Sequence, residues 1–92
     1  MKIGIIGAGK VGCSIGKYLT EHGFSVAGYC SKSKKSVEEA ATFTNTKAYD
    51  SLAELVAEST ILFLTTPDGA LKSVWNELKK ESIQNKKVCH FS

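Results

Sequence analysis

No apolar run in the sequence approaches the length of a transmembrane helix. The chain enters an apolar segment directly after its first two residues, so we expect no signal peptide. Three cysteines, Cys13, Cys30 and Cys89, are an odd number without metal-ligand spacing, which argues against a disulfide framework and favours a reducing cytoplasm. A net charge of +3 is too small to indicate a nucleic-acid partner. The sequence therefore predicts a cytoplasmic protein that binds neither membranes nor nucleic acids.

Several familiar arrangements of catalytic side chains are also missing. We find no Ser-His-Asp arrangement, no metal-binding cluster and no pair of acids placed for glycoside chemistry. The sequence accordingly predicts no catalytic residue and no metal ligand. Repeats, linkers and low-complexity segments are absent too, so we expect residues 1–92 to form one domain.

Short apolar segments alternate with amphipathic ones along the whole chain. This alternation predicts an α/β fold, in which a three-layer, doubly wound parallel sheet (a Rossmann fold) has the strand order 3-2-1-4-5. The segment near residues 47–49 is weakly signalled and should lie at the sheet edge, whereas the very apolar segment 60–65 should be central. Strands are expected at residues 2–6, 24–30, 47–49, 60–65 and 87–91, and helices at 10–22, 36–44, from 52 onward and at 69–81.

Local signals predict how the helices begin and which faces they bury. Ser36 and Ser51 each precede a glutamate by three residues, so both are expected to cap a helix through a capping box, and Asp68 is expected to cap a third helix. Cys30 and Cys89 are expected to be core residues of strands. Apolar residues at helical spacing should turn one face of the first helix toward the sheet: Val11, Ile15, Tyr18 and Leu19.

The most informative segment links the first strand to the first helix through the pattern G-x-G-x-x-G. Gly7 permits a tight turn, Gly9 leaves room for a pyrophosphate because it has no Cβ, and Gly12 lets the helix pack closely on the strand. The start of the helix offers free N–H groups to a phosphate. The pattern therefore predicts a dinucleotide site, with a ligand-free glycine turn as the alternative. The predicted cofactor-binding residues in this segment are Gly7, Ala8, Gly9, Lys10, Val11 and Gly12.

The segment after the second strand indicates which dinucleotide is bound. NAD sites usually place an acid about 20 residues beyond the glycines, where it bonds the ribose 2′-hydroxyl. Lys32 stands at that position, and no acid occurs between Glu21 and Glu38. The hydroxyls of Ser31 and Ser33 and the ammonium group of Lys32 suit a 2′-phosphate. We therefore predict NADP in preference to NAD, with a solvated loop as the alternative.

Two more residues at this edge of the sheet have open roles. His90 ends the fifth strand, where it would contact the nicotinamide or donate a proton, or else be purely structural. Cys13 lies in the first turn of a helix, a place that favours a thiolate, and the alternative is that it simply packs as a small apolar residue.

Three segments together resemble a known superfamily: residues 1–12, Cys30-Ser31-Lys32-Ser33 and Leu64-Thr65-Thr66-Pro67-Asp68. They resemble the N-terminal Rossmann domain of the 6-phosphogluconate-dehydrogenase-like superfamily, which includes pyrroline-5-carboxylate reductase and ketopantoate reductase. The likeness is greatest to a poorly characterised family of predicted NADP oxidoreductases, in which a helical domain follows the Rossmann-like domain.

The resemblance implies roles for residues that spacing alone does not assign. Thr65, Thr66 and Pro67 would lie over the riboses of the dinucleotide. Ser31-Lys32 stands where the resembling reductases carry Ser-Arg, and residues 90–92 look like the start of a His-x-Ser-Gly turn. A helical second domain would close the active site and form a homodimer, and these 92 residues lack it.

Two functions are consistent with these observations. The first is the NADP(H)-binding domain of an oxidoreductase, inactive alone, in which the cofactor exchanges a hydride with a small substrate. The second is a regulatory module that senses a dinucleotide without chemistry.

Overall fold

The computed structural model of the chain describes residues 2–31, 33–65, 76 and 86–90. Strands and helices alternate over these residues as the sequence predicts. The predicted helix at 69–81 and its cap Asp68 lie outside the described residues, except for Asn76, which is helical. The elements in chain order are β1 (Ile3–Ile6), α1 (Lys10–Glu21), β2 (Val26–Cys30), α2 (Lys34–Thr44), β3 (Lys47–Ala48), α3 (Leu52–Glu58), β4 (Ile61–Leu64) and β5 (Lys87–His90).

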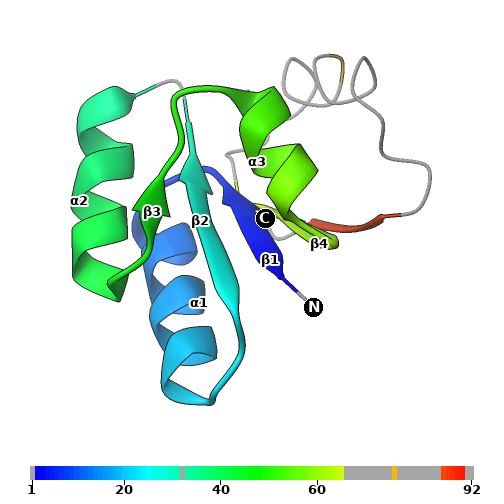
Figure 1. Ribbon diagram of the computed structural model, residues 1–92. Helices are drawn as coiled ribbons and strands as arrows, with labels where there is room; N and C mark the ends of the chain where they lie inside the picture. Colours follow the sequence, from blue (N-terminus) through cyan, green and yellow to red (C-terminus); the bar gives the residue numbers. More distant parts are fainter. Residues whose placement is uncertain (1, 32, 66–75, 77–85, 91–92) are drawn as a thin grey trace.

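The five strands form one parallel sheet in the order β3-β2-β1-β4-β5 (Figure 1). Ile6 at the end of β1 is aligned with Cys30 on one side and Leu64 on the other, and Leu64 is aligned with His90. The carboxyl ends of four strands therefore meet at one edge of the sheet. The predicted fold class and strand order are confirmed, including the edge position of β3 and the central position of β4.

The sheet is covered on both faces, with α1 and α2 on one side and α3 on the other (Figure 1). Side chains of β1 alternate between two cores, because successive residues of a strand point to opposite faces. One core contains Ile3, Ile5, Ala8, Leu19, Tyr29, Val37 and Ala40. The other contains Ile6, Cys30, Tyr49, Leu55, Val56, Leu62 and Leu64. The described helices include none that is long and apolar enough to cross a membrane.

The face that α1 turns to the sheet agrees only in part with the prediction, since Leu19 and Ile15 pack against the core as expected but Val11 and Tyr18 do not. Val11 and Tyr18 are 47% and 59% exposed, whereas Gly12, Gly16 and Leu19 are buried. The two glycines have no side chains, so this face of the helix can approach the sheet most closely, and that approach rotates Val11 and Tyr18 outward. The Tyr18 ring then stacks on His22 at a centroid distance of 4.1 Å.

Two further predictions about strands are wrong. The second strand begins at Val26 rather than at residue 24, because Phe24 belongs to the turn that ends α1 and its N–H group donates to the Leu19 carbonyl. Gly23 adopts a φ of 83°, as expected for the glycine just past a helix. Cys30 is buried as predicted, but Cys89 is exposed.

The helix caps also differ from the predicted capping boxes. α2 begins two residues before Ser36, and its N-cap is Ser33, whose Oγ accepts a hydrogen bond from the Ser36 N–H group. Ser33 prevails because it also fits the N-cap position and lengthens the helix by most of a turn. Ser51 is the N-cap of α3 as predicted, although its side chain makes no capping hydrogen bond there.

Candidate functional site

The turn after β1 lies at the point where the strand order reverses. Gly7 follows Ile6 directly, and its N–H group donates to the Cys30 carbonyl at the end of β2 at 2.8 Å. Gly7 has a φ of 108°, a left-handed conformation that a side chain would strain. The glycine turn is thus anchored to the neighbouring strand and bends sharply, in agreement with the role predicted for Gly7.

Gly9 has a different environment. It is the exposed N-cap of α1, with a φ of −81° that any residue adopts, and a Cβ placed there would have no heavy atom within 4 Å. Neither backbone conformation nor packing within the described protein requires glycine at this position. A requirement for glycine at this position would therefore have to come from something beyond the described residues that approaches the backbone closely, as a bound pyrophosphate would.

Gly12 is the residue at which α1 touches the turn. A Cβ there would lie 2.5 Å from the Gly7 carbonyl oxygen and 2.9 Å from Thr65 Oγ1. Both separations are shorter than van der Waals contact. The close packing predicted for this glycine is therefore present, and it brings the start of α1 against the end of β1.

The first turn of α1 faces solvent beyond these glycines. The Cys13 N–H group donates to the Gly9 carbonyl at 2.9 Å, which starts the helical hydrogen bonding. The N–H groups of Lys10, Val11 and Gly12 precede it and have no helical partner. Lys10 and Val11 are exposed. This helix start can therefore offer N–H donors and the positive end of its dipole to an anion.

Thr65 follows β4 and stabilises the same turn from the other side. Thr65 is only 8% exposed, and its hydroxyl group donates to the Ile6 carbonyl at 3.2 Å and to the Gly7 carbonyl at 3.1 Å. Its N–H group donates to Ile6 as well, at 2.9 Å. The Thr65 hydroxyl therefore holds the glycine turn, and the predicted contact with a ribose stays a prediction.

Two serines follow β2 at the same edge. Ser31 Oγ accepts from the Ser33 N–H group at 3.4 Å, and Ser33 Oγ accepts from the Ser36 N–H group at 3.3 Å. Both hydroxyls act as acceptors in these contacts, so their hydrogens are available to a further acceptor such as a phosphate oxygen. The local structure thus leaves Ser31 and Ser33 able to play the role predicted for them.

Lysines begin both helices that start at this edge. Lys10 is the first residue of α1, and Lys34 and Lys35 are the first two of α2, while neither helix has an acid in its first turn. Acids stabilise the N-terminus of a helix and cations destabilise it. The two helix starts therefore form an electropositive edge, and a bound anion would offset its unfavourable positive charge.

Four predicted site residues lie wholly or partly outside what the structure describes. Lys32, Thr66 and Pro67 lie outside the described residues. The backbone of His90 lies in β5, where it is aligned with Leu64. The structure thus brings together the glycine turn, Ser31, Ser33 and Thr65, and the cofactor-binding roles of all the predicted site residues stay predictions. Among the described residues, no group of three His, Cys, Asp or Glu side chains could hold a metal ion.

The surroundings of Cys13 disfavour an activated thiol. Burial raises its pKa, and the nearby negative charge of Glu39 raises it further. Its Sγ faces the Ala8 carbonyl oxygen at 3.7 Å. Burial and Glu39 thus oppose the effect of the helix start, and the packing interpretation of Cys13 is favoured.

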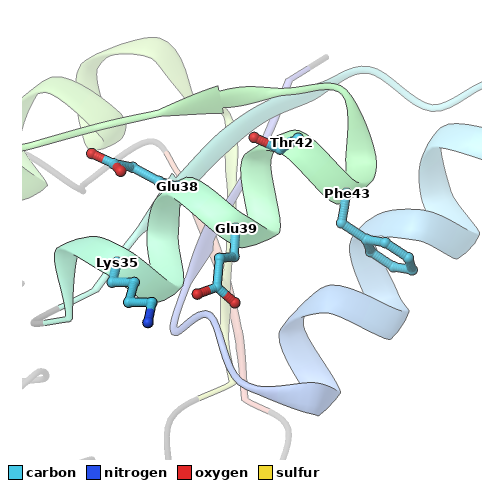
Figure 2. A pocket seen from close by; sticks show the side chains of 5 residues that line it. All are labelled: Lys35, Glu38, Glu39, Thr42 and Phe43. Atoms are coloured by element: carbon cyan, nitrogen blue, oxygen red, sulfur yellow. The ribbon is translucent and has the colours of Figure 1, made fainter.

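A shallow groove of about 520 Å³ lies along the outer side of α2. Figure 2 shows Phe43 directed toward α1 and Glu38 directed away from it. The Lys17 ammonium group lies over the Phe43 ring at 5.1 Å, which links the two helices. The groove contains none of the predicted cofactor-binding residues, although Lys35 at its end also belongs to the electropositive start of α2. Its lining is Lys35, Glu38, Glu39, Thr42 and Phe43.

One residue that contacts the site was not predicted from the sequence. Tyr29 of β2 is fully buried, and its hydroxyl donates to the Gly12 carbonyl at 2.8 Å. Its pKa is raised to about 12, chiefly by burial and also by Cys13, while a hydrogen bond with Thr44 opposes the rise. The signal that was available was the pair Gly12 and Gly16, whose close approach to the sheet requires a large side chain opposite them.

This shift in pKa predicts an alkaline loss of stability. The folded-state pKa of Tyr29, about 12, lies above the ordinary value of 10.0, so the neutral hydroxyl is favoured by folding. The contribution of the neutral Tyr29 hydroxyl to the free energy of unfolding is complete below pH 10 and should be lost as pH rises toward about 12. Urea melts of the parent and Tyr29→Phe across this range measure it. We expect the variant to lose less stability than the parent, and parallel losses would contradict the assignment.

Three features together define a dinucleotide-binding Rossmann domain: the parallel sheet, the glycine turn at its switch point, and the start of α1 with N–H groups that have no helical partner. A family model described as NADP oxidoreductase, coenzyme F420-dependent, matches residues 2–89, and the chain belongs to this family. The resemblance to the Rossmann domains of 6-phosphogluconate-dehydrogenase-like proteins is confirmed. The chain is thus an NAD(P)-binding domain related to dehydrogenases and reductases. No curated protein matches it significantly.

Solved structures share the fold. Arogenate dehydrogenase of Synechocystis is 25% identical with a TM-score of 0.87, over 100% of this chain and 33% of that chain. A variant of the imine reductase of Myxococcus stipitatus, solved with NAD⁺, is 21% identical with a TM-score of 0.77, over 95% and 28% of the two chains. The reductive aminase of Aspergillus terreus is 16% identical with a TM-score of 0.78, over 97% and 31%. The chain thus spans about a third of each of these proteins.

Proposed function

We propose that this domain binds NADP(H) for an oxidoreductase, in which the cofactor exchanges a hydride with a small molecule held partly by residues outside this domain. The observation on which the proposal depends is Gly9. Neither its backbone conformation nor its packing against the described residues requires glycine, and it stands where a pyrophosphate would approach the start of α1.

The preference for a 2′-phosphate is proposed from the edge beside β2. Ser31 and Ser33 keep hydroxyl hydrogens that can be donated, and α2 begins with two lysines and no acid. Lys32 stands between the serines in the sequence. A carboxylate here would repel a phosphate, whereas hydroxyl and ammonium groups form charge-assisted hydrogen bonds with it.

The domain would bind and orient the dinucleotide, and the nicotinamide would supply the hydride chemistry. The N–H groups at the start of α1 would hold the pyrophosphate, and Thr65 would keep the glycine turn in shape. We further propose that residues beyond this domain complete the substrate pocket and form a homodimer. The family description names coenzyme F420, which makes that coenzyme the first reaction partner to test.

The proposal predicts that NADPH binds about tenfold more tightly than NADH, a difference of about 1.4 kcal/mol. The preference should fall as salt rises, because salt screens exposed charges. Titration of both cofactors at two salt concentrations measures it. Lys32→Ala should reduce the preference, whereas Lys87→Ala makes the same change of charge at the opposite end of the strands and should not. Equal affinities in the parent would contradict the NADP assignment, and no binding of either would contradict the proposed function.

A further inference from the structure

Tyr29 connects β2 to the first turn of α1. Its side chain is fully buried between the sheet and the helix, and its hydroxyl donates to the Gly12 carbonyl at 2.8 Å. Gly12 is the last glycine of the predicted dinucleotide pattern, and its N–H group is among the donors at the helix start. The hydrogen bond therefore reaches the peptide segment that would face a pyrophosphate, from a strand that does not itself carry the glycine turn.

Gly16 gives Tyr29 the space for this contact. A Cβ at Gly16 would overlap the Tyr29 hydroxyl and lie 2.9 Å from Cζ of the ring. The end of the ring therefore sits against the bare backbone of α1 between its first and second turns. Shape and hydrogen bond together fix both the height of the helix above the sheet and its rotation.

The first turn of α1 is only weakly stabilised by its own residues. Two glycines within the 12 residues of α1 weaken the helix, because glycine loses more backbone freedom on folding than other residues. Gly9 adds no capping side chain. The first turn of α1 is thus held by few interactions of its own, and contacts from neighbouring strands must order it.

Two side chains supply those contacts from opposite sides. Thr65 bonds the Gly7 carbonyl, against which Gly12 packs, and Tyr29 bonds the Gly12 carbonyl. The Thr65 contact fixes the turn, and the Tyr29 contact fixes the helix that follows. The relative position of the two determines where the free N–H groups point.

We propose that Tyr29 is a positioning residue for the dinucleotide, because its hydroxyl orders the first turn of α1 and so aims the N–H groups at the pyrophosphate. The inference extends the proposed function and depends on it for the identity of the ligand. It does not depend on it for the ordering of the helix, which is a property of the free protein.

Tyr29→Phe tests the proposal because it removes the hydroxyl and keeps the ring. We expect the Kd for NADPH to rise about fivefold, the factor that corresponds to one neutral hydrogen bond. In the free protein, amide NMR should show faster hydrogen exchange at Cys13, whose N–H group donates to the Gly9 carbonyl, with α3 unchanged. Tyr49→Phe is the matched control, since Tyr49 is buried in the core on the other face of the sheet. That variant should leave both the Kd and the exchange at α1 unchanged.

The affinity and the hydrogen exchange test the positioning role independently of each other. Affinity for NADPH equal to that of the parent, measured below the melting temperature of every variant, would overturn the positioning role. Unchanged exchange at the start of α1 would overturn it too, and this measurement needs no ligand. If the parent itself fails to bind NADPH, the proposed function is wrong, and the exchange data still decide whether Tyr29 orders the helix.

Discussion

Gly9→Ala should weaken NADPH binding about a hundredfold, or roughly 2.7 kcal/mol, while the protein remains folded. A Cβ at this position meets no atom of the described protein, and the backbone conformation suits alanine. With the dinucleotide bound, the same Cβ would displace the pyrophosphate from the N–H groups of α1. Loss of one or two charge-assisted hydrogen bonds, each worth about 1.5–3 kcal/mol, gives an effect of this size.

Gly9→Ser separates binding from stability. Serine is a favoured N-cap residue, so this variant should be at least as stable as Gly9→Ala, and its melting temperature should equal or exceed that of alanine. It should nevertheless bind NADPH as poorly, because its side chain also begins with a Cβ. Thermal melts and fluorescence titrations of the three proteins measure both quantities. If either variant binds like the parent, the pyrophosphate is held elsewhere.

The sequence predicts the order of the strands because each of the central strands shows a clear signal. Ile61 to Leu64 is a short, uninterrupted apolar run that favours a strand between two neighbours, and β4 is such a strand. The glycine pattern likewise predicts the site, since each glycine answers a local requirement of turn, approach or packing. Gly7 and Gly12 meet these requirements within the protein itself.

The wrong predictions arise where two local signals compete for one position, or where a residue distant in the sequence determines which face of a helix is buried. Ser33 and Ser36 both suit an N-cap, and the sequence alone favours the one with a glutamate three residues on. Val11 and Tyr18 look like core residues by spacing, yet Gly12 and Gly16 take the inner face because Tyr29 fills the space opposite them. That last contact joins residues 17 apart in the sequence. Periodicity within one helix contains no information about it.

Gly12→Ala should destabilise the protein more than any change at Gly9. The new Cβ would lie 2.5 Å from the Gly7 carbonyl oxygen, so either α1 or the glycine turn must move. Overpacking of this kind costs about 1–3 kcal/mol. For a domain of this size, a cost near the upper limit corresponds to a fall in melting temperature of about 12–24 °C. NADPH affinity should fall as well, even at temperatures where the variant is folded, because the displaced helix no longer aims its N–H groups at the ligand.

Two comparisons identify the cause of this loss. Ser14→Ala adds no atoms and alters an exposed position of the same helix, so it should melt within about 4 °C of the parent, or roughly 0.5 kcal/mol. Thr65→Ala combined with Gly12→Ala removes the 2.9 Å contact with Thr65 Oγ1 but leaves the shorter contact with the Gly7 carbonyl. The double variant should therefore remain less stable than Thr65→Ala alone, since the backbone carbonyl is the obstacle and both variants lose the same threonine hydrogen bonds. Equal stability of these two variants would instead assign the packing constraint on Gly12 to the threonine side chain.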